Sequence, residues 1–247
     1  AMDFISDDKN MALLGSDRRM NYFPTSKFSL KVDSSKVLSN GTVPPELAGK
    51  IVPEVKWDVD RSYVLKNDMM ILDLLANNNW ERPVYFAITT GNDSYIGLEN
   101  YFQLEGLAYR LIPVPTESGD GQTGRVNTTL MYENLMNKFN WGGMDKEKIY
   151  MNENNRRMCM NVRNNFARLA EALIKEGKKD KAIAVLDKCL QVIPERNVPY
   201  DFFMLPVAEA YYRAGAADKA NAITEKLSDI YADNLDYYFS LDMEKYN

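Results

Sequence analysis

The feature that most constrains the fold is a pattern of large and small residues in the last third of the chain. Large apolar residues and alanines recur three and four positions apart, on either side of a glycine. This spacing places them on one face of each of two helices. Small residues let paired helices approach closely, whereas large residues fill the space to the next pair. The pattern comprises Phe166, Leu169, Ala170, Leu173, Gly177, Ala182, Leu186, Cys189 and Pro194.

A second copy of the pattern follows the first. The tripeptide Asp-Lys-Ala occurs at residues 180–182 and again at residues 218–220. The two copies resemble tetratricopeptide repeats, which implies two helical hairpins. Because roughly three repeats usually form a free-standing solenoid, we expect the pair to pack on neighbouring structure. Ala232 and Asp233 stand where the pattern would end in proline. The second copy comprises Val207, Ala208, Tyr211, Gly215, Ala220 and Leu227.

The earlier part of the chain predicts a mixed α/β unit. Short apolar runs alternate there with Gly, Pro and Asn, and the change to long helical periodicity predicts a domain boundary near residue 150. The expected fold class is α+β, with a mixed α/β domain over residues 1–150 and a helical repeat pair over residues 151–247. Strands are predicted at residues 27–32, 51–59, 83–89 and 107–114, and helices at residues 68–76, 99–104 and 129–139.

Two of these segments predict a specific arrangement. Residues 68–76, capped by Asn67 or Asp68, are so rich in Met, Ile and Leu that the helix should be buried on most sides. Residues 83–89 lack alternation, which indicates a strand covered on both faces. Strand, helix and strand in this order predict a small sheet with a right-handed βαβ unit.

Charge and hydropathy exclude several classes. A net charge of −5 and a pI near 5.0 argue against a nucleic-acid-binding protein, which needs a basic face. No apolar run approaches the roughly 18 residues of a membrane span, so we expect a water-soluble chain. Residues 1–4 have the look of a segment cut from a longer protein, whose own relation to a membrane is open.

The absence of histidine removes the commonest catalytic arrangements. Ser-His-Asp and Cys-His nucleophiles and nearly all catalytic zinc sites need an imidazole, and the chain has none. Cys159 and Cys189 are too far apart in sequence for a metal-binding pair and are expected to be buried free thiols, although one bridge between them stays open. Any chemistry would therefore have to use carboxylates, Lys, Tyr or a bound metal; we predict no metal ligand and no cofactor.

Residues 119–124 match the GxGxxG pattern of dinucleotide-binding loops. The context differs, because the glycines do not directly end a strand and residues 125–128 delay the next helix. We therefore interpret the segment as a surface loop.

Three carboxylates form an alternative site. Asp58 and Asp60 end one predicted strand and Asp93 follows another, so parallel strands would bring them to one edge of the sheet. Grouped carboxylates bind Ca²⁺ or Mg²⁺. The favoured interpretation is that the three residues cap turns and helix starts.

Aromatic residues are the other candidates for ligand contact. Trp80 and Arg82 fall in a loop that a sugar could reach, whereas Tyr85 and Phe86 lie on the strand expected to be buried. Tyr212 is the candidate on the repeats. Helical spacing favours packing for most tyrosines of that region, namely Tyr200, Tyr211, Tyr212, Tyr231, Tyr237 and Tyr238.

Several longer segments resemble a membrane family of Bacteroides-like bacteria, numbered 2723 among the domains of unknown function. They are residues 17–24, 40–45 with 51–54, 66–73 with 79–87, and 101–110. Members resemble multi-spanning protein O-mannosyltransferases that use a lipid phosphosugar. The resemblance implies a C-terminal domain at the periplasmic face of the inner membrane, while the catalytic acid belongs to a membrane half that these 247 residues do not include.

The resemblance implies an accessory role without catalysis. The expected partner is a protein or acceptor polypeptide, or a glycan. Two other hypotheses stay open: an independent tetratricopeptide-type scaffold, and a glycan-processing enzyme with two carboxylates about 5 to 10 Å apart in one cleft.

Overall fold

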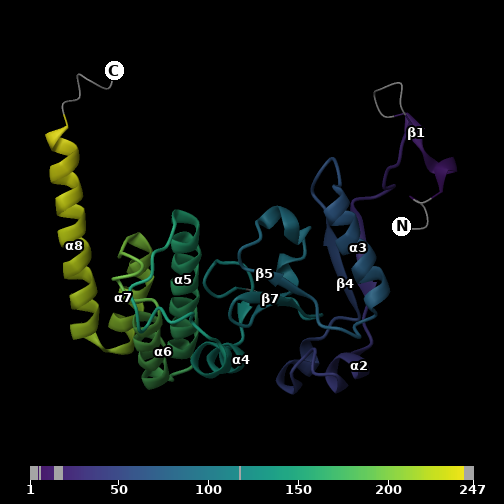
Figure 1. Ribbon diagram of the computed structural model, residues 1–247. Helices are drawn as coiled ribbons and strands as arrows, with labels where there is room; N and C mark the ends of the chain where they lie inside the picture. The colour runs from purple at the N-terminus through teal and green to yellow at the C-terminus, as the bar shows by residue number, and fades with distance from the viewer. Residues whose placement is uncertain (1–4, 6, 14–18, 117, 242–247) are drawn as a thin grey trace. The chain divides into compact units, whose positions relative to one another are not determined.

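The computed structural model describes residues 5, 7–13, 19–116 and 118–241 (Figure 1). The chain forms two compact units: unit 1 comprises Ala1–Gln103 and Ala108–Arg125, and unit 2 comprises Leu104–Leu107 and Val126–Asn247. The fold is of the predicted α+β class, with small sheets and a C-terminal helical region. The domain boundary near residue 150 stays a prediction. Residues 1–4, and Asp17 and Arg18 of the segment 17–24, lie outside the described residues.

Unit 1 contains two small antiparallel sheets before its first long helix. One pairs β1 (Ala12–Leu13) with β2 (Arg19–Met20), and the other pairs β3 (Lys27–Lys31) with β4 (Glu54–Asp58). β3 confirms the strand predicted at residues 27–32. β4 is shorter than residues 51–59 because the Val52 amide donates to the Pro113 carbonyl, outside the β3–β4 ladder. Short helical turns complete this region: η1 (Asp8–Asn10), α2 (Ser34–Ser39) and η2 (Pro45–Lys50).

Helix α3 (Lys66–Asn78) begins two residues earlier than predicted. Leu65 is the N-cap, and its amide donates to the Asp68 carboxylate at 2.9 Å. The helix buries Leu72 and Leu75, whereas Met70 is 67% exposed. The prediction that α3 is buried on most sides is therefore wrong. Only one face of the helix is covered, and because apolar residues occur all around α3, some of them are exposed to solvent.

The remaining strands form a four-stranded sheet in the order β5-β7-β6-β8. β5 pairs antiparallel with β7, and Phe86 lies opposite Tyr109. The predicted βαβ unit is wrong, because β4 and β5, on either side of α3, belong to different sheets. The strands are β5 (Tyr85–Ala87), β6 (Phe102–Leu104), β7 (Ala108–Leu111) and β8 (Arg125–Val126).

An aromatic cluster packs on this sheet. Phe86, Tyr95, Phe102 and Tyr109 contact one another with ring centroids 4.9 to 6.0 Å apart. β5 alternates, with Phe86 buried and Tyr85 48% exposed, so the prediction of a strand covered on both faces is wrong. The helix predicted at residues 99–104 is a single turn followed by β6. The turns here are η3 (Asn92–Tyr95) and η4 (Glu99–Tyr101).

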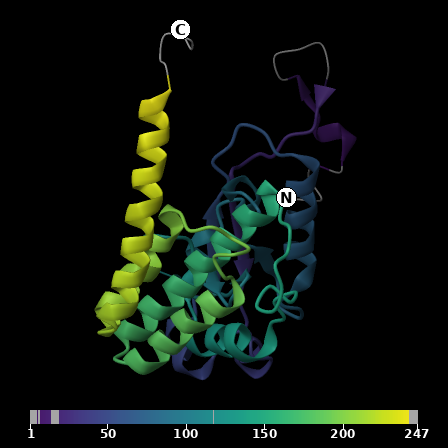
Figure 2. The same cartoon turned by 60° about the vertical axis from the view of Figure 1, so that its left-hand side comes forward.

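Unit 2 is mainly helical (Figure 2). The helix predicted at residues 129–139 forms α4 (Thr128–Glu133), continued by a π-helical turn, η5 (Asn134–Lys138). Two hairpins follow, in which α5 contacts α6 and α7 contacts α8, while α7 also contacts α5 and α6. Their elements are α5 (Glu153–Lys175), α6 (Lys179–Val192), η6 (Phe202–Met204), α7 (Leu205–Ala214) and α8 (Ala217–Ser240).

The large and small residues of the sequence pattern build this helical core. Ala170, Ala182, Ala208 and Ala220 are at most 2% exposed, which allows the helices to pack closely. Gly177 (φ 76°) and Gly215 (φ 93°) adopt the left-handed conformation at the ends of α5 and α7, where glycine carries little steric cost. The two predicted hairpins are therefore confirmed as a repeat-like pair.

Candidate functional site

A cavity of about 230 Å³ in unit 1 contains two of the predicted ligand residues. Trp80 and Arg82 both line it, together with Lys31, Thr42 and Asn78. The loop between α3 and β5 supplies both candidates. Whether they contact a ligand stays a prediction.

Hydrogen bonds fix both the side chain and the backbone of Trp80. Its indole Nε1 donates to the Lys31 carbonyl at 2.9 Å, and the Asn40 side chain donates to the Trp80 carbonyl at 2.7 Å. Asn79 (φ 45°) and Trp80 (φ 59°) share a left-handed backbone that turns the indole inward. Trp80 is only 8% exposed, so a ligand could reach its indole only through the cavity that it lines.

Arg82 is exposed, but its backbone is fixed. Its amide donates to the Asn78 side-chain oxygen at 3.2 Å, and the Asn78 side-chain nitrogen donates to the Arg82 carbonyl at 2.8 Å. One asparagine at the end of α3 thus fixes the approach to β5. Tyr85 follows on that strand, and the guanidinium carbon of Arg110 lies 5.8 Å from the centre of its ring.

The three carboxylates of the alternative metal site do not group. Asp58, Asp60 and Asp93 are each exposed, and no cluster of three potential acidic, cysteine or histidine ligands occurs among the described residues. The physical reason is the sheet topology: β4 and β5 are not parallel neighbours, so their ends do not meet at one edge.

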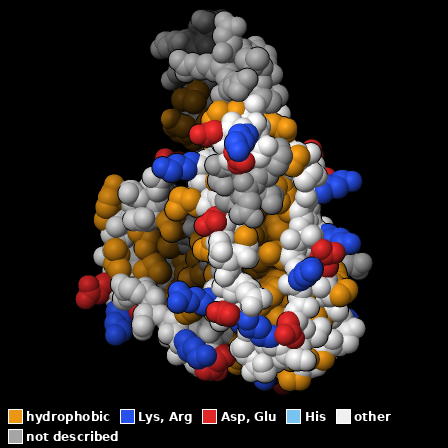
Figure 3. Space-filling view, turned by 90° about the vertical axis from the view of Figure 1, so that its right-hand side faces the viewer, with side chains coloured by type: hydrophobic (Ala, Val, Ile, Leu, Met, Phe, Trp, Pro, Cys, Tyr) orange, Lys and Arg blue, Asp and Glu red, His pale blue; other side chains and the backbone are white. Residues whose placement is uncertain are grey.

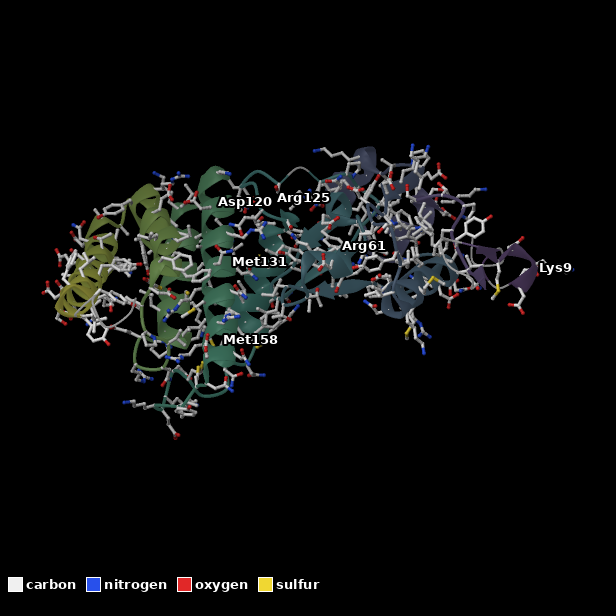
Figure 4. All side chains as sticks on the ribbon, turned by 90° about the horizontal axis from the view of Figure 1, so that it is seen from above. Lys9, Arg61, Asp120, Arg125, Met131 and Met158 are labelled. Atoms are coloured by element: carbon white, nitrogen blue, oxygen red, sulfur yellow. The ribbon has the colours of Figure 1, made fainter. Side chains whose placement is uncertain are left out.

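The glycine-rich segment 119–124 is a loop that leads into β8. Gly121 and Gly124 have positive φ, and the Gln122 amide donates to the Asp120 carboxylate at 3.0 Å. Arg125, labelled in Figure 4, donates to the Gln103 side-chain oxygen at 2.6 Å. Because a strand follows the glycines, the loop presents no helix N-terminus to a phosphate.

A larger hollow in unit 1 was not foreseen from the sequence. It has a volume of about 890 Å³ and is lined by Tyr22, Phe23, Phe28 and Tyr63 among others. Arg61 lies on its wall, 3.4 Å from the Asp68 carboxylate (Figure 4). Hydrophobic side chains gather between charged ones on the face of the molecule drawn in Figure 3. The available signal was three aromatic residues within the short stretch 22–28.

A buried arginine organises the link between the two hairpins. Arg163 of α5 is fully buried and donates to the carbonyls of Ile193 (3.0 Å), Val198 (2.6 Å) and Pro199 (3.2 Å). The Tyr200 ring lies against its guanidinium, at 5.3 Å. Burial lowers the pKa of Arg163 from its usual value. An arginine on an otherwise apolar helix face was the signal in the sequence.

The two cysteines are free, as predicted. Cys189 is buried, and burial raises the pKa of its thiol to about 12. Cys159 is half-buried, and desolvation also raises its pKa. Both thiols are therefore protonated at neutral pH and are weak nucleophiles.

Most tyrosines of the repeats are exposed, contrary to the packing interpretation. Tyr211 is buried and donates to the Asp187 carboxylate at 2.8 Å. Tyr212 is 45% exposed and donates to the Asn221 side chain on α8 at 2.6 Å. Tyr231, Tyr237 and Tyr238 are also exposed, since α8 continues past the helices that would cover them.

In the part of the chain that the structure describes, every helix is too short or too polar to cross a bilayer. Comparison with curated proteins and with solved structures gives no match. A family model described as TMEM260-associated domain 2 matches residues 1–130, which is just over half of the chain. The match spans β1 to β8, including the cavity at Trp80 and Arg82. The chain therefore belongs to the family of the TMEM260-associated domain 2.

Proposed function

We propose that the chain is a non-catalytic, extracytoplasmic accessory part of a membrane glycosyltransferase-like protein. The observation that carries this proposal is the family match over residues 1–130, because that domain is tied to a membrane glycosyltransferase-like family. We also propose that the chain belongs to family 2723 and that it lies at the periplasmic face of the inner membrane. The chain would act by binding a protein partner, an acceptor polypeptide or a glycan.

The helical pair supports a role in protein contact. Its closely packed hairpins, with buried alanines and glycine-ended helices, support a tetratricopeptide-type assignment for unit 2. Stacked hairpins of this kind present extended surfaces to peptides and helices. The protonated thiols of Cys159 and Cys189 also favour contact over covalent chemistry.

The proposal is tested in cells by replacing these codons, in the gene of the longer protein, with a flexible linker. Mannose on envelope proteins is measured by lectin blotting, and the amount of protein in the membrane is measured in the same samples. We expect loss of mannosylation at an unchanged membrane level, because the remaining membrane half has lost its accessory contacts. Unchanged mannosylation at that level contradicts an accessory role.

The location is tested separately. Alkaline phosphatase, which folds only outside the cytoplasm, is fused to the longer protein directly after the residue numbered 247 here. An active fusion is expected at the periplasmic face, and an inactive fusion with a stable chain contradicts that location.

A further inference from the structure

Helix α8 is much longer than the helix against which it packs. α7 has 10 residues and α8 has 24. At a rise of about 1.5 Å per residue, α8 exceeds its partner by roughly 20 Å. Figures 1 and 2 both show its C-terminal half projecting past α7.

The first half of α8 is fixed to the hairpins. Ala220, Ile223 and Leu227 are buried, and Lys219 and Lys226 pair with Asp187 and Glu195. Beyond Leu227, as far as the structure describes the chain, the side chains of α8 make hydrogen bonds only within the helix, as from the Ser240 hydroxyl to the Tyr237 carbonyl at 2.7 Å. The helix therefore changes from a packed to an unpartnered element near Leu227.

The buried face of α8 continues into this projecting half. At about 100° per residue, five apolar side chains after Leu227 fall within about 80° of its direction, in line with Ala220 and Ile223, whereas Ala232 and Phe239 lie outside this sector. Tyr231 is 41% and Tyr238 64% exposed, whereas a helix face of this composition is normally covered. We call this surface the α8 stripe; it comprises Ile230, Tyr231, Leu235, Tyr237 and Tyr238.

The charge of the projecting half has one sign. Asp229, Asp233 and Asp236 lie on the side opposite the stripe and along its flank, and no Lys or Arg occurs from residue 227 to residue 241. The segment thus carries a net charge of −3, the sum of these three carboxylates. A second copy would bring like charges together, and anionic membrane surfaces attract helices rich in Lys and Arg instead.

We propose that the α8 stripe docks an amphipathic helix of a partner protein, whose apolar face is flanked by Lys or Arg. Two observations select this occupant: the stripe continues an established helix–helix interface, and its charge is complementary to a basic helix. Asn234 lies in the middle of the stripe, where a single polar residue fixes the register of a paired helix. The inference rests on the proposed role in protein contact.

The test uses the full chain and a synthetic helical peptide with Leu on one face and Lys on the other. Binding is measured by calorimetry for the chain and for the variant Tyr231→Ser/Tyr238→Ser. We expect at least tenfold weaker binding by the variant, because it loses two central apolar contacts. The matched control Tyr150→Ser, which alters a tyrosine that is 92% exposed outside α8, should change the affinity less than twofold.

The contribution of charge is measured separately. Asp233→Asn/Asp236→Asn should weaken binding of the Lys peptide and reduce its salt dependence, and a Leu/Glu peptide should not bind. Circular dichroism establishes that each variant keeps its helix content.

Equal binding by chain and tyrosine variant, or failure of the Lys peptide to bind, overturns the proposal. So does self-association of the chain that Tyr238→Ser abolishes, which would assign the stripe to a second copy. Binding to phosphatidylglycerol vesicles that the same variant abolishes would assign it to a membrane and also overturn the proposal. Each of these outcomes is compatible with loss of mannosylation when the whole chain is replaced by a linker, so failure of this inference is distinguishable from failure of the accessory role.

Discussion

At the scale of single residues, the best-defined interaction in unit 2 is that of Arg163. Its guanidinium satisfies three carbonyls of the segment between α6 and α7. Asn197 of that segment in turn binds the backbone at Met144, Glu147 and Ile149. A buried polar side chain with several backbone partners fixes a connection that lacks regular structure of its own.

Arg163→Met should therefore lower the free energy of unfolding by about 3 kcal/mol, because the carbonyls lose charged donors and stay buried. Urea denaturation measures the change. Arg157→Met is the control on the same helix, since its side chain is 65% exposed, and it should change stability by less than about 0.5 kcal/mol. Equal effects of the two substitutions would contradict the role assigned to Arg163.

Cys189 predicts a dependence of stability on alkaline pH. Its pKa is raised from 9.0 to about 12 in the folded chain, so the folded state keeps a proton that the unfolded state loses as pH rises above 9. Stability contributed by the neutral thiol is thus complete below pH 9 and is lost toward pH 12. Between pH 8 and 10, the chain should lose about 1.4 kcal/mol more than Cys189→Ala. Identical pH slopes in urea denaturation would show that burial does not shift this thiol.

At the scale of elements, the connection from η3 to η4 depends on Gly97. A Cβ built on Gly97 would lie 2.1 Å from the Asp58 carbonyl oxygen, at the end of β4, and its φ is 86°. Gly41 has a similar φ of 71°, but a Cβ there meets nothing within 4 Å. Comparison of Gly97 with Gly41 therefore separates the cost of a steric clash from the cost of a positive φ.

Gly41→Ala should cost about 1 kcal/mol for its positive φ alone. Gly97→Ala should cost about 3 kcal/mol or more, because backbone rather than a flexible side chain must move. Thermal unfolding of the two variants measures the difference. A loss at Gly97 no greater than that at Gly41 would contradict the close approach to β4.

The helices were more predictable than the sheets. The hairpin could be predicted from residues such as Ala170, Ala182 and Leu186, because helical periodicity depends on residues only three and four positions apart. Strand pairing is a relation between distant segments, so the residues of β5 identified a strand without showing that β7 would be its partner. For the same reason, the apolar density of α3 indicated a helix but not which face the neighbouring sheets would leave uncovered.

Ligand contact at Trp80 and Arg82 stays a prediction. Their shared cavity was not predicted, because the left-handed backbone at Asn79 and Trp80, which accompanies the buried indole, occurs at residues other than glycine. The grouping of Asp58, Asp60 and Asp93 depended on parallel strands and is lost with them. Arg163 escaped prediction because its partners are backbone carbonyls, which every sequence contains.

At the scale of the whole molecule, the family match and the repeat pair cover different parts of the chain. The match ends at residue 130, before α5 begins at Glu153. The proposed contact surface on α8 is thus outside the matched domain. Residues 1–130 carry the family match, and the partner surface that we propose lies on the helices that follow.

The central claim is that this chain assists sugar transfer without performing it. Transfer of radiolabelled mannose from polyprenyl-phosphate mannose to an envelope acceptor protein is measured for the longer protein in liposomes, for that protein without this chain, and for the chain alone. We expect transfer by the longer protein, a rate at least tenfold lower without this chain, and no transfer above background by the chain alone. Mannose transfer by the purified chain alone would contradict it.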